Sequence, residues 1–205
     1  MLNNKYFKEL ENLNVFISNE SKVSDKAKVL FNSVILGKCD IDDGAIIGPN
    51  SIIVDSVICK DAQVLNSYVT NSFVGEKSTV GPFAHLRDNS EIGSDCRIGN
   101  FVEIKKSKIG NKSKASHLAY IGDSDIGYDC NFGCGAITVN YDGINKYKTI
   151  IGDNVFIGCN TNLVAPVTIH NNSFIACGST ITSDVPENTL AIARSRQLNK
   201  IDYYK

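Results

Sequence analysis

The chain has 205 residues, of which 42% are apolar, and a formal net charge of −1 at pH 7. This length is enough for one soluble domain with a sizeable core, and the balanced charge argues against a nucleic-acid or membrane partner. No stretch approaches the roughly 18 apolar residues of a membrane span, and the polar start MLNNKYFKELENLN lacks the apolar region of a signal peptide. The sequence therefore predicts a cytoplasmic protein.

Residues 1–14 show no periodic pattern. A short helix that flanks or caps the following domain is expected there, because the terminal units of a repeat protein need a polar cover. The repeats begin at residue 15.

From residue 15 to residue 185, apolar residues recur every six positions, a period that fits neither a helix nor a simple strand. The series consists of Ile17, Val23, Val29, Ile35, Ile41, Ile47 and Ile53, then Val74, Val80, Leu86, Ile92, Ile98 and Ile104, then Ile109, Ala115 and Ile121, then Ile126 and Phe132, and finally Ile151, Ile157, Leu163, Ile169, Ile175 and Ile181. A small or β-branched residue usually stands four positions later, as at Ser33, Ala45, Val57 and Cys96. Hexapeptide periodicity is the signature of an all-β, single-stranded parallel β-helix, in which three repeats, about 18 residues, make one triangular coil with both positions pointing inward.

The repeat is interrupted between Phe132 and Ile151, where the spacing is 19 residues and two repeats would take 12. An inserted loop at about residues 138–149 is therefore expected, and its Asn, Tyr, Asp and Lys residues mark it as a place for function on a rigid scaffold. Residues 186–205 are expected to form a C-terminal tail.

Seven cysteines are an odd number, and none forms a C-x-x-C pair. This usage favours neither a disulfide framework nor a zinc site, and it predicts reduced thiols in a reducing compartment. The three histidines, His85, His117 and His170, occupy different phases of the repeat, so they are not expected to converge on a metal. The inward small position is expected to bury three of the cysteines, Cys39, Cys96 and Cys130.

Coils that stack about 4.8 Å apart place equivalent residues in columns. Arg87 and Lys105 stand one full coil apart and share a column. Two neighbouring cations repel each other unless an anion lies beside them, and a phosphate suits both the planar fork of Arg and the point charge of Lys. The alternative is a pair of solvated surface cations that splay apart.

A second column contains Asn100, His117 and Cys134, and it continues to Cys159 and Cys177 if the loop returns in register. Small side chains beyond His117 would leave a shallow groove along the axis. Such a groove suits a long, thin, mostly neutral ligand whose reactive end stops at the histidine. The alternative is that these cysteines are small surface fillers.

Five stretches, GPFAHLR, GNFVEIKKS, SKASHLAYIGDSDIG, AITVNYDGINKYKTIIGDNVFIG and LVAPVTI, carry a family resemblance. They resemble the acetyltransferase domain of the bifunctional N-acetylglucosamine-1-phosphate uridyltransferase/glucosamine-1-phosphate N-acetyltransferase family, which belongs to the hexapeptide-repeat acyltransferases. The resemblance implies a left-handed β-helix and a homotrimer that binds its substrates between subunits. The nucleotide-binding half of that family has no match in this chain, which is therefore not expected to make a UDP-sugar by itself.

The resemblance also implies a role for each matching residue. His117 stands at the position of the catalytic base. The residues at sugar-phosphate positions are Arg87, Lys105, Tyr120 and Asn131, and those at acetyl-coenzyme A positions are Cys134, Asn140, Tyr141, Lys146, Cys159, Cys177 and Arg194. Relatives commonly carry Ala or Ser at the three cysteine positions, so a hydroxyl role at Cys159 does not follow.

The implied reaction is acetyl transfer from acetyl-coenzyme A to the 2-amino group of glucosamine 1-phosphate, for UDP-N-acetylglucosamine and cell-envelope synthesis, and it needs no metal. An ammonium has no lone pair, so a base must remove a proton, and a neutral imidazole is available near neutral pH. Backbone N–H groups near Cys134 and Gly135 are expected to stabilise the developing oxyanion. Glu103 is expected to orient the base or to bind a sugar hydroxyl.

Two alternatives stay open. The substrate could be another amino-sugar phosphate, such as galactosamine 1-phosphate, or a nucleotide amino sugar, since two cations cannot read the stereochemistry of one hydroxyl. The chain could instead be a noncatalytic β-helix that binds without turnover. An enzyme is favoured by the joint presence of His117, Tyr120, Asn140, Tyr141, Lys146 and Arg194. A separate uridyltransferase chain is left open as a partner.

Overall fold

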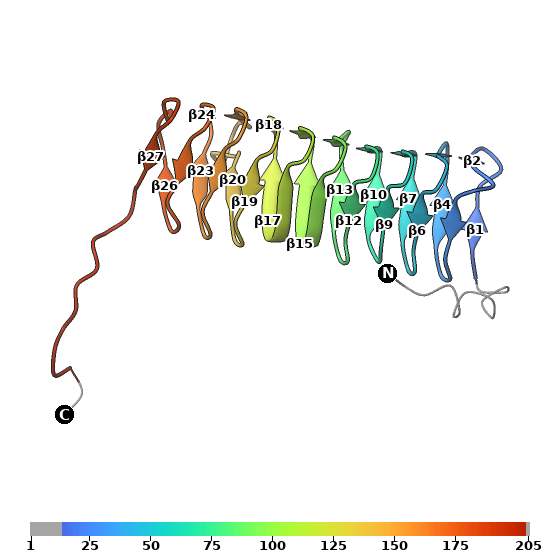
Figure 1. The fold of residues 1–205 in the computed structure, drawn as a ribbon, viewed down its shortest axis with the longest axis horizontal. Helices are drawn as coiled ribbons and strands as arrows, with labels where there is room; N and C mark the ends of the chain where they lie inside the picture. The colour runs from blue at the N-terminus through green and yellow to red at the C-terminus, as the bar shows by residue number, and fades with distance from the viewer. Residues whose placement is uncertain (1–13, 204–205) are drawn as a thin grey trace.

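The computed structural model describes residues 14–203, and in this range the chain is built of short parallel strands and contains no helix. The strands stack into an elongated solenoid in which chain order follows the long axis, from β1 at one end to β27 at the other (Figure 1). The described part of the chain thus has no helix that could cross a membrane. The all-β parallel β-helix predicted from the six-residue period is confirmed.

Each coil contributes strands to three faces, and each strand pairs in parallel with the equivalent strand of a neighbouring coil. Face one contains β1 (Phe16–Ile17), β4 (Val34–Leu36), β7 (Ile52–Val54), β10 (Tyr68–Thr70), β13 (His85–Arg87), β20 (Ile137–Val139), β23 (Asn162–Val164) and β26 (Thr180–Ile181). Face two contains β3 (Lys28–Val29), β6 (Ile46–Ile47), β9 (Gln63–Val64), β12 (Thr79–Val80), β19 (Asn131–Phe132), β22 (Phe156–Ile157), β25 (Phe174–Ile175) and β27 (Leu190–Ala191). Face three contains β2 (Lys22–Val23), β5 (Asp40–Ile41), β8 (Val57–Ile58), β11 (Phe73–Val74), β14 (Glu91–Ile92), β16 (Lys108–Ile109), β18 (Ser124–Ile126), β21 (Thr149–Ile151) and β24 (Val167–Ile169).

Two strands are longer than the rest. β15 (Arg97–Lys105) and β17 (Lys114–Gly122) begin on face two and continue around the corner onto face one. They pair with each other from one end to the other. The corner between faces two and one is therefore most regular where His117 lies.

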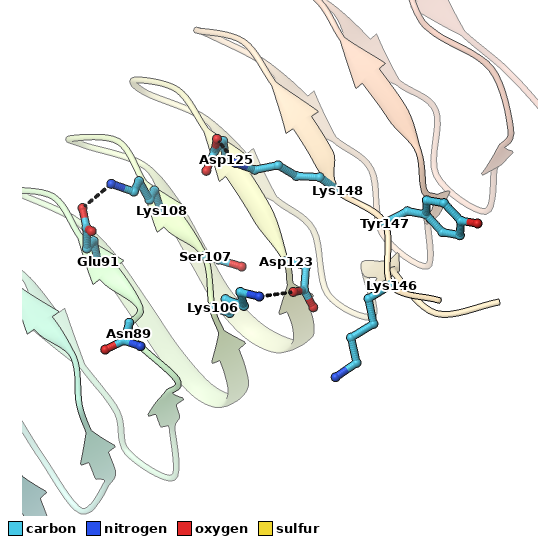
Figure 2. A pocket seen from close by; sticks show the side chains of 10 residues that line it. All are labelled: Asn89, Glu91, Lys106, Ser107, Lys108, Asp123, Asp125, Lys146, Tyr147 and Lys148. Carbon is cyan, nitrogen blue, oxygen red and sulfur yellow. Dashed lines mark ion pairs between the residues drawn. The ribbon is translucent and has the colours of Figure 1, made fainter. Parts of the chain in front are cut away.

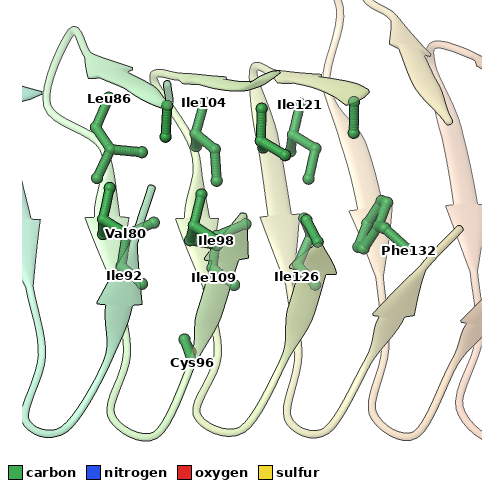
Figure 3. Packing of buried hydrophobic residues seen from close by; sticks show 14 of the residues in the cluster. Val80, Leu86, Ile92, Cys96, Ile98, Ile104, Ile109, Ile121, Ile126 and Phe132 are labelled. Atoms are coloured by element: carbon green, nitrogen blue, oxygen red, sulfur yellow. The ribbon is translucent and has the colours of Figure 1, made fainter. Parts of the chain in front are cut away.

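The apolar repeat positions form one continuous core along the axis (Figure 3). Leu86, Ile104 and Ile121 follow one another in successive coils and are fully buried. Burying a side chain of this size stabilises the fold by about 1.5–3 kcal/mol, so the column of aliphatic residues holds the coils together. The cysteines predicted to be inward, Cys39, Cys96 and Cys130, are buried.

The solenoid has more five-residue steps than the sequence analysis predicts. Between the expected positions Ile53 and Val74, three further residues are fully buried, namely Ile58, Val64 and Val69. The step from Ile53 to Ile58 is five residues, so the small inward position falls on Ser56 and leaves Val57 exposed. The prediction that Val57 points inward was wrong, because a strict count of six carries the register one residue too far.

The first coil is less covered than the others. Ile17 is exposed, and Val23 and Val29 are half-buried, since among the described residues β1, β2 and β3 pair with a coil on one side only. The flanking helix predicted for residues 1–14 lies, except for Asn14, outside the described residues. At the other end β27 pairs with β25, and the chain then leaves the solenoid as an extended tail (Figure 1).

Ile53 tests the stacked core away from the polar residues described below. It is fully buried, with Ile35 and Val69 as its register partners in the adjacent coils. We expect Ile53→Ala to lower the free energy of unfolding by about 2–5 kcal/mol, because it removes buried methyl groups and leaves a cavity. Chemical denaturation of variant and wild type measures the difference, and a change below about 0.5 kcal/mol, typical of a surface position, would contradict this packing.

Candidate active site

The corner where face two turns into face one carries the column that contains His117, named here the histidine column. β15 and β17 pair through this corner with Asn100 opposite His117. After the loop the chain returns in register, because β19 pairs with β22 and β22 with β25. Backbone hydrogen bonds of 2.8 Å then run from Asn160 N–H to the Cys134 carbonyl and from Gly178 N–H to the Cys159 carbonyl. As predicted, the column contains Asn100, His117, Cys134, Cys159 and Cys177.

His117 is exposed, and its Nδ1 lies 2.8 Å from Oδ1 of Asn100. An amide oxygen only accepts hydrogen bonds, so this contact places the ring proton on Nδ1 and leaves the lone pair on Nε2. A neutral imidazole held in this way keeps Nε2 available as a base. Asn100 was predicted to lie in the column, but no role was assigned to it, although its register with His117 was the available signal.

In three successive coils, the residue one position after the histidine column is large and apolar and has a left-handed backbone. Phe83, Phe101 and Leu118 have φ angles of 59°, 58° and 39°, where coils before and after have Asn66 and Gly135. More than half of each of the three side chains is exposed, and the rings of Phe83 and Phe101 stack with centroids 5.5 Å apart. Left-handed residues recur at the corners of this solenoid and are mostly Asn and Asp, so bulky apolar residues in this conformation are unusual. These three residues are called the corner ridge below.

The far end of the histidine column meets the C-terminal tail at Arg194. Arg194 Nη1 donates a hydrogen bond of 2.9 Å to the Cys177 carbonyl and lies 3.2 Å from Cys177 Sγ. The three cysteines of the column are free and exposed, so the strip beyond His117 presents open thiols that end at a cation.

One expected oxyanion donor is already engaged. The N–H of Gly135 donates to the Leu118 carbonyl at 2.7 Å, because the left-handed turn at this corner directs it to the preceding coil. This corrects the expectation for Gly135. The N–H of Cys134 is the remaining candidate donor beside His117.

At its other edge, face one ends in a column of cations. Arg87 and Lys105 are register partners, as predicted. Arg87 Nε pairs with Glu103 at 2.8 Å and its Nη1 with Asp88 at 2.9 Å, while Lys105 Nζ pairs with Asp123 at 2.9 Å. The repulsion expected between the two cations is therefore relieved within the chain. The contact observed for Glu103 is therefore with Arg87 and not with His117.

Asp123 connects this column of cations to the inserted loop. Its Oδ2 accepts hydrogen bonds from Lys105 Nζ at 2.9 Å and from Asn140 Nδ2 at 2.5 Å, and the side chains of Lys105 and Asp123 are only 8% and 11% exposed. Burial alone would raise the pKa of Asp123, but the hydrogen bonds from Lys105 and Asn140 outweigh burial and lower it below its ordinary value. Asp123 is thus a charged anchor for the start of the loop.

A polar cavity of about 480 Å³ opens beside Asp123, between the loop and the corner where face one turns into face three (Figure 2). Its charged lining residues are Glu91, Lys106, Lys108, Asp123, Asp125, Lys146 and Lys148. Contact with Lys105 lowers the pKa of Lys146, since two ammonium groups lie close together. An anion bound between Lys105 and Lys146 would relieve this repulsion.

Tyr120 lies on face one as the register partner of Glu103. Its ring lies against Gly122, where an added Cβ would stand 2.5 Å from the Tyr120 hydroxyl oxygen. Gly122 is the register partner of Lys105. The absence of a side chain at Gly122 therefore lets the Tyr120 ring lie next to the cations.

The inserted loop between β20 and β21 has a defined shape. Tyr141 and Lys146 form an antiparallel bridge across it, and the Tyr141 hydroxyl donates to the Gly143 carbonyl at 2.6 Å. Asp142 accepts hydrogen bonds from two backbone N–H groups of the loop, which lower its pKa. The Tyr141 side chain is exposed, and the hydrogen bond described above joins it to the loop itself.

Within one chain, the expected site residues fall into two groups at opposite edges of face one. His117, the three cysteines and Arg194 lie at the corner that precedes it, and Arg87, Lys105, Asn140 and Lys146 lie at the corner that follows it. Asn131 joins neither group, because it lies on face two and pairs with Lys114 and Phe156.

The other two histidines lie elsewhere. His85 stacks on Tyr68 on face one with ring centroids 5.2 Å apart, and His170 follows β24 on face three. Residues 14–203 contain no group of three or more His, Cys, Asp or Glu side chains arranged to hold a metal ion.

Comparison with known proteins gives matches in sequence over nearly the whole chain. Residues 71–106 and 148–183 match the family described as bacterial transferase hexapeptide (six repeats). The chain is 61% identical over 214 aligned residues to the bifunctional protein GlmU of Acholeplasma laidlawii, in a match that covers 98% of this chain and 46% of that relative. The chain thus spans about half the length of this curated relative. These matches confirm the resemblance indicated by the sequence motifs.

Solved structures match the fold. LpxA, a UDP-N-acetylglucosamine acyltransferase from Bacteroides fragilis, has a TM-score of 0.58 at 19% identity. The match covers 85% of the present chain and 70% of the LpxA chain. A mutant of GDP-perosamine N-acetyl transferase from Caulobacter crescentus, in complex with CoA and GDP-perosamine, has a TM-score of 0.50 at 21% identity. This match covers 58% of the present chain and 53% of the transferase chain. At such identities the likeness concerns the fold, a left-handed parallel β-helix.

Proposed function

We propose that this chain transfers an acetyl group from acetyl-coenzyme A to the 2-amino group of glucosamine 1-phosphate. The observation that carries the proposal is the contact of His117 Nδ1 with Asn100 at the head of an open column of thiols. It provides a base at the head of an exposed strip of small side chains, along which a long, thin thioester arm can lie. The relative and the acyltransferase structures described above support this class of reaction.

In the proposed reaction, the nitrogen of the substrate amine forms a bond to the thioester carbonyl carbon, and Nε2 of His117 takes a proton from that amine. The carbon–sulfur bond then breaks, and the leaving thiolate takes the proton from the His117 imidazolium, so that coenzyme A leaves as the thiol and the base is regenerated. Proton removal by a positioned base is typically worth about 10²–10⁴ in rate. We assign the N–H of Cys134 as the donor to the developing oxyanion, and Asn100 keeps the imidazole in the tautomer that accepts the proton.

The phosphate of the sugar is proposed to bind at the column of cations. Arg87 pairs with Glu103 through Nε and with Asp88 through Nη1, and its Nη2 group is the part proposed to meet the phosphate. Lys105 and Lys146 offer two ammonium groups whose mutual repulsion an anion relieves. Lys146, expected at the cofactor from the resemblance, is here assigned to the phosphate because it lies beside Lys105. Asn140 and Tyr141 stay assigned to acetyl-coenzyme A and Asn131 to the sugar.

Gly122→Ala tests the placement of Tyr120 beside this anion site. The added methyl group displaces the Tyr120 ring, a side chain that can move, so the backbone is expected to tolerate the change. We expect KM for glucosamine 1-phosphate to rise about tenfold, as for one lost hydrogen bond to a charged group, with a smaller effect on kcat. Steady-state kinetics beside Tyr120→Phe checks this, and an unchanged KM in both variants would place Tyr120 outside the sugar site.

A homotrimer is proposed because one copy leaves the two groups of site residues at opposite edges of face one. A second copy packed on the corner ridge would bring its own loop and cations toward His117 of the first. Phe83, Phe101 and Leu118 together form an exposed apolar strip, which is the kind of surface that a subunit contact covers. A cytoplasmic location accords with the seven free cysteines, and a separate uridyltransferase chain would use the product.

The substrate is tested by comparing kcat/KM for glucosamine 1-phosphate, glucosamine 6-phosphate and galactosamine 1-phosphate, with the product followed by mass spectrometry. We expect glucosamine 1-phosphate to be preferred and glucosamine 6-phosphate to react slowly. The phosphate must reach the cations while the amine reaches His117, and only one position of the phosphate on the sugar allows both. A preference for galactosamine 1-phosphate or a nucleotide amino sugar would change the assigned substrate. Saturable binding without turnover would indicate a noncatalytic β-helix.

A further inference from the structure

The seven thiols of the chain fall into two classes. Four are buried or half-buried, Cys39, Cys59, Cys96 and Cys130, and burial raises the pKa of Cys59, Cys96 and Cys130. Such thiols are poor nucleophiles. The other three are exposed in the histidine column, Cys134, Cys159 and Cys177, with about 4.8 Å between neighbouring strands. A molecule lying along the column passes all three sulfurs.

Cys177 differs from the other two column thiols in its contact with Arg194. The guanidinium Nη1 lies 3.2 Å from Cys177 Sγ and is held there by its 2.9 Å hydrogen bond to the Cys177 carbonyl. Among the described residues, no cationic side chain contacts the sulfur of Cys134 or Cys159. A guanidinium at this distance can donate to a thiolate and balance its charge, and the thiolate is the form of cysteine that attacks disulfides.

We propose that Cys177 is a site of reversible mixed-disulfide formation with a low-molecular-weight disulfide, coenzyme A disulfide in particular. The Cys177 thiolate attacks one sulfur of that disulfide and forms a new S–S bond, while the original S–S bond breaks. The other half leaves as a thiolate and takes up a proton. Cys177 is oxidised and the leaving half is reduced, so the exchange needs no other oxidant.

The consequence is a block of the histidine column. An adduct on Cys177 fills the end of the histidine column next to Arg194, so acetyl-coenzyme A cannot lie there, and exchange with a free thiol restores the site. That coenzyme A fits the column rests on the proposed function. The reactivity of Cys177 itself rests only on the contact with Arg194.

The test incubates the reduced chain of 205 residues with coenzyme A disulfide or with hydroxyethyl disulfide and follows each cysteine by peptide mass spectrometry. We expect Cys177 to be modified about fivefold faster than Cys134 or Cys159 with either reagent, faster still with coenzyme A disulfide, and to be restored by dithiothreitol. Arg194→Gln is expected to slow the reaction of Cys177 with hydroxyethyl disulfide about fivefold. Arg196→Gln, in the same tail, is the matched control and is expected to react like the wild type.

Equal rates at the three column cysteines, or an unchanged rate in Arg194→Gln with hydroxyethyl disulfide, would overturn the proposal. A preference for Cys177 with hydroxyethyl disulfide, without any advantage for coenzyme A disulfide, would support the reactive thiol and refute coenzyme A as its partner. That last outcome would also count against the proposed function. The two proposals can therefore fail separately.

Discussion

Replacing His117 with alanine is expected to reduce kcat for acetyl transfer by about 10²–10⁴, the usual contribution of a positioned base, with much smaller changes in the two KM values. The fold should be unaffected, since the ring is exposed and its hydrogen bond is to one side chain, Asn100. Product formation followed by mass spectrometry, under saturating concentrations of both substrates, measures the loss.

Asn100 provides the control that separates chemistry from binding. Because Asn100 acts through the imidazole, Asn100→Ala is expected to lower kcat about tenfold, as expected for the loss of one hydrogen bond, and to leave KM for acetyl-coenzyme A unchanged. Asn100→Asp retains an oxygen that accepts from Nδ1 and should recover most of the activity. If His117→Ala kept more than about a tenth of wild-type kcat, His117 would not be the base.

Replacing Asp123 with alanine is expected to weaken both the fold and the site. The change leaves the nearly buried ammonium of Lys105 without its carboxylate and releases Asn140 at the start of the loop. We expect the free energy of unfolding to fall by about 1.5–3 kcal/mol, the value of a hydrogen bond to a charged group. We expect kcat/KM for glucosamine 1-phosphate to fall by about 10- to 100-fold, because the phosphate and loop groups lose their positions.

Asp125 offers the matched control for Asp123. It also pairs with a lysine, Lys148, but this pair is much more exposed, so Asp125→Ala is expected to change stability by less than about 1 kcal/mol. Equal effects of the two substitutions on stability and on kcat/KM would contradict the role of Asp123 as the anchor of the loop.

The pair of Asp123 and Lys105 also predicts how stability depends on pH. The pKa of Asp123 is lowered in the folded chain, so its stabilisation is present above its unfolded pKa, about 3.9, and is lost as pH falls through the folded value. For Lys105, burial opposes the shift, but the hydrogen bond to Asp123 outweighs it and raises the pKa, so its stabilisation is lost only as pH rises above about 10.4. Denaturation of wild type and Asp123→Asn should therefore show a constant difference near neutral pH that shrinks below about pH 4. A difference that grows in acid would contradict the assigned pair.

The fold was predictable because one physical pattern repeats along the chain. Aliphatic residues every six positions must face a common core, and this period alone indicates a triangular parallel β-helix. The register around Val57 was not predictable from a strict count of six, because Ser56 and Val57 are both small enough for the inward position. Only the stacking of Ile58 on its neighbours in adjacent coils decides between them.

The candidate site was predictable where it depends on columns and not where it depends on long side chains. The alignment of His117 with Cys134 and Cys159 follows from coil register. The ion-pair partners of Arg87 and Lys105 could not be predicted from coil register, since Glu103 and Asp123 reach these cations across neighbouring coils. The proximity of Lys146 to Lys105 depends on the path of the inserted loop, which lies outside the repeat and carries no periodic signal.

The most direct test of the central claim is the reaction of the purified chain with acetyl-coenzyme A and glucosamine 1-phosphate, analysed by mass spectrometry and proton NMR. We predict N-acetylglucosamine 1-phosphate, acetylated on the 2-amino group, together with an equal amount of free coenzyme A. A folded protein that binds both substrates and forms no such product would contradict this prediction.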